Sequence, residues 1–164
     1  MQQQKELDQD ETLFMHNPSL VSKAEKYLFT SDDNGFVKQF SISEHTLKHD
    51  WGHLHNGWIT NIQSTNDYLF TKDVTGNLKQ WSLKTRKLIR DWYWDVNHDR
   101  ASAFCLSNNG LELFMCNYEG YLKQFSLEDQ KIINDFGKIH NGEIHSLKTT
   151  SDDKFLFTYE PYGP

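Results

Sequence analysis

The chain has 164 residues, of which 37% are hydrophobic and 14% aromatic, and a formal net charge of −6. This length and apolar content are sufficient to bury a core, and the weakly acidic charge argues against the basic surface of a nucleic-acid-binding protein. No apolar stretch approaches the roughly 18 residues of a membrane span, and the N-terminal segment is too polar and acidic for a signal peptide. We therefore expect a cytoplasmic protein that binds neither nucleic acid nor membranes.

The first segment, residues 1–10, is polar and lacks apolar periodicity, which predicts a flexible N-terminus. Residues 11–17 (ETLFMHN) resemble an outermost strand that leads into a turn. The repeated part of the chain is expected to begin at residue 11 and to continue to residue 164.

A hairpin is predicted next. Residues 26–31 and 36–42 alternate apolar and polar side chains and are rich in β-branched and aromatic types, which indicates two strands. Asp32, Asp33, Asn34 and Gly35 stand between them and suit the positive φ of a tight reversal.

The hairpin phrase then recurs along the chain. KYLFTSDDNGFVKQFSI (26–42) is followed by DYLFTKDVTGNLKQWSL (67–83), LELFMCNYEGYLKQFSL (111–127) and a shorter copy, KFLFTYEPYG (154–163). The turn glycines Gly35, Gly76, Gly120 and Gly163 are 41, 44 and 43 residues apart, a period typical of repeat architectures. The sequence predicts further strands before the hairpins (58–63, 101–106, 143–148) and after them (87–92, 131–136).

Four short strands per period predict an all-β fold, a β-propeller of four-stranded antiparallel blades. About three blades are complete and a fourth is partial, with approximate limits 11–50, 51–95, 96–137 and 138–164. One blade cannot cover both faces of its own sheet, whereas stacked blades cover one another, so repetition provides the core. Cys105 and Cys116 fall on neighbouring predicted strands and are expected to be small core residues.

A second phrase precedes the first strand of each predicted blade, which is termed the innermost strand. GHLHNGWI (52–59) reappears as GKIHNGEI (137–144), and weaker forms occur near residues 15 and 96. One histidine therefore precedes each predicted blade: His16, His55, His98 and His140. Zinc sites need three or four ligands that converge on one point, whereas these four histidines would lie at different angles around an axis and are therefore interpreted as structural. His53, two residues before His55, is interpreted as a loop residue. We expect no metal, no cofactor and no catalytic residue, because every prominent acid is explained by a turn and no catalytic motif is present.

With these motifs the chain resembles the WD40 repeat family over nearly its whole length. The resemblance implies that a histidine, a Ser or Thr of the second strand, an Asp of the following turn and a Trp of the third strand lock each blade by hydrogen bonds. The second blade has all four candidates: His55, Thr71, Asp73 and Trp81. The others depart from the pattern, with Phe40 in the first blade, Met115, Asn117 and Phe125 in the third, and Glu160 in the fourth.

Two further features carry predictions. A Lys-Gln pair occurs in every third strand, and a buried Gln repeated in this way is interpreted as a link between neighbouring blades. In the stretch DWYWD, Tyr93 replaces the glycine of the other repeats and Trp94 is added, so these two aromatics are candidate partner-binding residues. Packing along the edge of their own blade is the alternative.

The expected function is a non-catalytic scaffold that binds other proteins as part of a larger propeller or assembly. A regulatory or sensing propeller attached to an enzyme or channel is the alternative, and an enzyme that uses a central funnel is a third hypothesis. Three arrangements of the ring stay open: a piece of a longer propeller, a homodimer that completes one ring, and a small closed ring in which residues 11–15 join the partial blade.

Overall fold

The computed structural model describes residues 18–22, 26–94 and 100–161. All fourteen elements formed by these residues are β-strands, so the all-β prediction is confirmed. They build three four-stranded sheets and one two-stranded sheet, each antiparallel and each made of strands that are consecutive in the chain. Residues 1–10, the strand expected at 11–15, His16, His98 and Gly163 lie outside the described residues.

The sheets are numbered here in chain order. Sheet one contains β1 (Ser19–Val21), β2 (Tyr27–Ser31), β3 (Phe36–Ser41) and β4 (Thr46–His53). Sheet two contains β5 (Ile59–Ser64), β6 (Tyr68–Asp73), β7 (Leu78–Ser82) and β8 (Leu88–Trp92). Sheet three contains β9 (Ala103–Leu106), β10 (Glu112–Cys116), β11 (Tyr121–Ser126) and β12 (Ile132–Lys138). Sheet four contains β13 (Ser146–Thr149) and β14 (Leu156–Tyr159).

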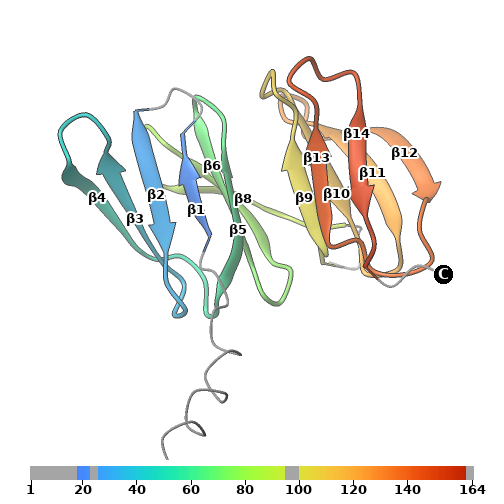
Figure 1. Cartoon of the computed structure of the whole chain (residues 1–164), viewed down its shortest axis with the longest axis horizontal. Helices are drawn as coiled ribbons and strands as arrows, with labels where there is room; N and C mark the ends of the chain where they lie inside the picture. The colour runs from blue at the N-terminus through green and yellow to red at the C-terminus, as the bar shows by residue number, and fades with distance from the viewer. Residues whose placement is uncertain (1–17, 23–25, 95–99, 162–164) are drawn as a thin grey trace, which may run out of the picture.

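The innermost strands of consecutive sheets are neighbours. β1 contacts β5, β5 contacts β9, and β9 contacts β13, while β4, β8 and β12 form the opposite margins of their sheets (Figure 1). Three hydrophobic clusters fill the spaces between facing sheets. The first joins sheets one and two around Phe29 and Leu69, the second joins sheets two and three around Phe70 and Phe104, and the third joins sheets three and four around Phe114 and Leu147.

The turn glycines within the described residues have a second role besides the reversal. Gly35 has φ +82°, and its carbonyl accepts the backbone N–H of Leu54 at 2.9 Å, in the linker to the next sheet. Gly120 repeats this contact, with φ +88° and the N–H of Ile139 at 2.9 Å. A Cβ atom on Gly35 would stand 2.1 Å from the carbonyl oxygen of His55. These positions need glycine because both the positive φ and the close approach of two backbones exclude a side chain.

Candidate functional site

The four candidate blade-locking residues, His55, Thr71, Asp73 and Trp81, form one chain of hydrogen bonds at sheet two. His55 Nδ1 lies 3.1 Å from Asp73 Oδ2, and His55 Nε2 lies 2.7 Å from Thr71 Oγ1. Trp81 Nε1 donates to the same Thr71 oxygen at 2.9 Å. These contacts fit an imidazole that donates from Nδ1 to the carboxylate while the Thr71 hydroxyl donates to Nε2 and accepts from the indole. The linker before β5 is thereby tied to β6 and β7.

The same aspartate also holds the turn after β6. Its Oδ1 accepts the backbone N–H groups of Thr75 at 2.9 Å and Asn77 at 3.0 Å. Burial raises the pKa of Asp73, but hydrogen bonds from His55, Asn77 and Thr75 outweigh burial and hold the pKa below its usual value. The ionised carboxylate is therefore a structural part of the lock.

The other sheets repeat only parts of this arrangement. Asp32 and Asn117 hold their turns in the same way. In each residue the side-chain Oδ1 accepts the backbone N–H groups of the residues two and four positions later. In sheet four, His140 Nε2 lies 2.7 Å from Thr158 Oγ1, and His140 Nδ1 lies 3.1 Å from Glu160 Oε2. A glutamate can therefore take the place of the aspartate as the hydrogen-bond partner of the histidine. Sheet two is the one described sheet in which a tryptophan joins the set.

The repeated glutamine does not link neighbouring sheets, which corrects the interpretation made from the sequence. Gln39 accepts the indole N–H of Trp51 at 3.2 Å, and Gln80 accepts that of Trp92 at 3.0 Å, in each case within one sheet. Because the Trp lies on the fourth strand, the glutamine connects the third strand to the fourth. Sheet three has Phe136 at that position, and Gln124 donates instead to Glu112 at 2.9 Å.

The two candidate partner-binding aromatics lie in different environments. Trp94 is 6% exposed, belongs to the core between sheets two and three, and has Lys123 Nζ 4.2 Å from its ring centroid. A side chain buried in this way cannot serve as an exposed anchor, so the packing alternative describes Trp94. Tyr93 is 41% exposed and remains a candidate.

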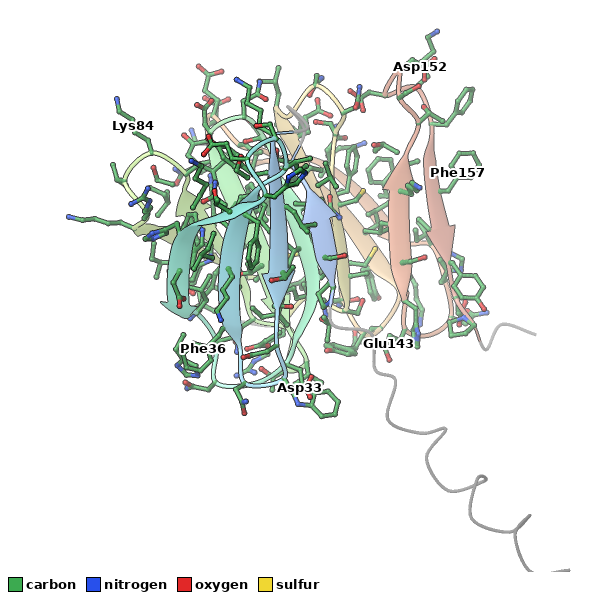
Figure 2. All side chains as sticks on the ribbon, turned by 60° about the vertical axis from the view of Figure 1, so that its left-hand side comes forward. Asp33, Phe36, Lys84, Glu143, Asp152 and Phe157 are labelled. Atoms are coloured by element: carbon green, nitrogen blue, oxygen red, sulfur yellow. The ribbon has the colours of Figure 1, made fainter. Side chains whose placement is uncertain are left out.

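A surface that the sequence analysis missed lies on the loops at the turn-glycine end of the sheets. The exposed side chains of Trp58, Val74, Arg100 and Tyr118 define this loop surface. Val74 N donates to Trp58 O at 2.8 Å, and Arg100 Nη1 donates to Thr75 O at 3.2 Å. A Cβ atom on Gly76, in the same turn, would lie 3.2 Å from the Tyr118 hydroxyl, so consecutive loops are connected. Asp33, Phe36 and Glu143 mark the same end of the molecule in Figure 2. Aligning the residue before each innermost strand and the residue after each turn Asp or Asn would have found these positions.

The remaining chemically notable groups have structural surroundings. Among the residues that the structure describes, no three His, Cys, Asp or Glu side chains form a group that could hold a metal ion. His53, interpreted from the sequence as a loop residue, is instead the last residue of β4, where it pairs with Phe36, and the two rings pack with centroids 5.1 Å apart. Cys105 and Cys116 are free thiols buried in the core beside sheet four, and burial raises the pKa of Cys105 to about 12, which disfavours the reactive thiolate.

Fold and site together define an all-β protein of repeated antiparallel sheets that are joined by turn glycines and by histidine-centred hydrogen bonds. A scan of protein-family models and a search of curated proteins found no match to the chain. None of the described segments forms a helix with the length and apolar character that crossing a membrane requires.

Proposed function

We propose that this chain forms part of a WD40-like β-propeller that acts as a non-catalytic protein-interaction scaffold in the cytoplasm. The propeller interpretation is supported by the repeated order of strands within each sheet and by the contacts between successive innermost strands. It is also supported by the His-Thr-Asp-Trp hydrogen bonds of sheet two, which match the set that the family resemblance implies.

The loop surface is the observation that carries the binding role. It combines Trp58, Arg100 and Tyr118, and Trp, Tyr and Arg are the residue types most enriched among the hot spots of protein interfaces. Their loops are held by backbone contacts between sheets, so the surface is largely formed before a partner arrives, which lowers the entropic cost of binding. The chemistry of the surface fits a protein partner with an apolar patch and an acidic group for Arg100.

A direct test is affinity purification of the tagged chain with quantitative mass spectrometry. The variant Trp58→Ala/Tyr118→Ala should recover specific partners at least about tenfold less efficiently, because truncation of one hot-spot aromatic typically costs about 2 kcal/mol or more. Ile89→Ala, an exposed apolar residue on β8, is the matched control and should retain them. Equal recovery by all three proteins, at equal thermal stability, would place the binding surface elsewhere.

A further inference from the structure

A cavity of about 380 Å³ opens between sheets one and two, at the end of the molecule opposite the loop surface. Its walls are formed by residues beside the start of β2, in the turn between β5 and β6, and in the turn between β7 and β8. Lys84, in the last of these turns, marks this end in Figure 2, while Asp33 and Phe36 mark the end that carries the loop surface. The two sheets on either side each have four strands, so the cavity lies between complete sheets.

The equivalent place between sheets two and three is closed by a hydrogen bond from one sheet to the next. There Arg90 Nη1 of β8 donates to Gln130 Oε1 at 2.6 Å. His49 of β4 holds the position of Arg90 in sheet one. Each of these two residues pairs with the repeated glutamine of its sheet and lies beside the tryptophan of its own strand.

Between sheets one and two this bond is replaced by two groups of the same character. Arg86 holds the position of Gln130, in the turn after the third strand, with φ +61° against +57°. Burial lowers the pKa of His49, and the positive charge of Arg86 lowers it further, against an opposing effect of Asp50. Among the described residues, neither the His49 ring nor the Arg86 guanidinium has a hydrogen-bond acceptor across the cavity.

A third position changes the sign of its charge. Lys26 begins the first hairpin phrase where Asp67 begins the second, and Lys26 lines the cavity together with Arg86. No described acidic residue forms an ion pair with either of these two cations. Residues 23–25 (KAE) lie outside the described residues and carry one charge of each sign, so they leave the excess positive charge unchanged.

The cavity wall also contains buried hydroxyl groups with a proton to donate. Ser22 and Thr65 are 6% and 7% exposed, and each Oγ accepts two backbone N–H groups of the residues that follow. Within the described part of the chain their hydroxyl protons have no acceptor, whereas Ser107 and Thr150, at the same position of sheets three and four, donate to a side chain two residues later. Gln39, whose oxygen is used within sheet one, leaves its amide NH₂ as a further donor.

We propose that this cavity binds the phosphate group of an organic phosphate monoester. Such a group carries a charge of about −1.5 to −2 at neutral pH and presents three strong acceptor oxygens. The two cations Lys26 and Arg86 match this charge, and they hold the phosphate by charge-assisted hydrogen bonds. The buried hydroxyls and the Gln39 amide donate to the oxygens that remain.

The size of the cavity assigns the phosphate to an organic molecule. Its volume falls in the range of sites for small organic ligands and leaves room for the group that carries the phosphate, beside Tyr27 and Leu83. A phosphorylated side chain of a protein and a free small phosphate present the same chemistry. The site does not rest on the loop surface, which lies at the other end of the molecule.

A titration of the ¹⁵N-labelled 164-residue protein by NMR tests the proposal at constant ionic strength. The ligands are the peptide Gly-Gly-phosphoserine-Gly-Gly, the same peptide with Glu in place of phosphoserine, and glycerol 3-phosphate. We expect saturable shifts of amides beside the cavity with the phosphopeptide and at least about tenfold weaker binding of the Glu peptide, which has one acidic group of lower charge. Tighter binding of the phosphopeptide than of glycerol 3-phosphate assigns the phosphate to a protein, and the reverse order assigns it to a small molecule.

Variants of the protein locate the site. Lys26→Asp/Arg86→Gln gives the cavity the residues of the equivalent place between sheets two and three and should bind the phosphopeptide at least about tenfold more weakly. Both side chains are exposed, so a thermal melt should show an unchanged fold. Lys84→Asp/Lys87→Gln changes the charge by the same amount in the same turn, outside the cavity wall, and should bind normally.

The outcomes separate this site from a general charge effect and from the loop surface. Equal loss in the two charge variants, equal binding of the phosphoserine and Glu peptides, or no saturable binding of either phosphate would overturn the proposal. Trp58→Ala/Tyr118→Ala should bind the phosphopeptide normally, so failure of the loop surface and failure of this site are distinguishable.

Discussion

The joint between sheets one and two and the joint between sheets three and four begin from nearly the same sequence and differ in how well they are covered. Both have a His-Asn-Gly linker, and in both the carbonyl of a turn glycine accepts two successive linker N–H groups. At the first joint Trp51 is 9% exposed beneath sheet two, while at the second Phe136 is 44% exposed beside the two-stranded sheet four. The backbone joint therefore positions a sheet, and the number of strands that follow decides how much apolar surface it buries.

The largest difference in stability between the two joints is expected for a leucine position that the repeat places at both of them. Leu69→Ala should lower the free energy of unfolding by about 3 kcal/mol, because Leu69 is 0% exposed and its removal leaves a cavity. Leu156→Ala should cost about 1 kcal/mol, because Leu156 is only partly buried. Urea denaturation with unchanged m-values measures both, and equal losses would mean that the second joint is as closed as the first.

The turn glycines should show the opposite behaviour, a similar and large cost at both joints. Gly35→Ala and Gly120→Ala would place a Cβ atom 2.1 and 2.3 Å from a carbonyl oxygen of the next linker, in addition to their positive φ. We expect a loss of roughly 3 kcal/mol for each.

Gly52→Ala and Gly137→Ala are the matched controls. These glycines have φ of +73° and +69° but nothing within 4 Å of the added atom, so only the backbone term of about 1 kcal/mol remains. If the controls proved as costly as the turn glycines, the conformational preference alone would explain the positions and the inter-sheet contact would not.

The histidine-centred hydrogen bonds give a third comparison. Asp73→Asn should lower the stability at neutral pH by about 2 kcal/mol, since it weakens a buried bond to a charged group. Glu160→Gln should cost less than about 1 kcal/mol, because its partner His140 is 26% exposed.

The pH dependence tests the charge on Asp73. Its folded pKa lies below the unfolded value, so its stabilising contribution is present above about pH 4 and is lost as the pH falls toward the folded pKa. Thermal melts between neutral and acid pH should therefore show the difference between wild type and Asp73→Asn shrinking at low pH. A difference that is constant with pH would assign its cost to packing.

The smallest effect is expected for the repeated glutamine. Gln39→Ala would leave the indole N–H of Trp51 without its acceptor and should cost about 1 kcal/mol. Gln124→Ala removes a part-buried hydrogen bond to Glu112 but leaves no indole N–H without an acceptor, because sheet three has Phe136 in place of the Trp, and should cost less than about 0.5 kcal/mol. Chemical denaturation of the two variants measures the difference, and Trp51→Phe should make Gln39 as replaceable as Gln124.

Much of the fold could be read from particular residues. Strand alternation and the Asp-x-x-Gly turns located the hairpins, and β2 and β3 begin within one residue of the predicted positions. The innermost strand of sheet four was predicted from residue 143 but begins at Ser146. The difference arises because Ile144 is buried in the linker, and apolar content alone does not distinguish a packed linker from a strand.

The sequence by itself determined the period and the strand order within each sheet, because these depend on local patterning and on copies of one phrase. The members of the His55 set were implied by the family resemblance and not by the pattern alone. Only the tertiary structure decided that Trp94 is buried, that the glutamines bond within their own sheet, and that Trp58, Arg100 and Tyr118 come together on neighbouring loops. Each of these depends on what another sheet or strand places beside the residue. A repeat predicts which positions are equivalent, but the neighbours of each position are set by packing between segments far apart in the chain.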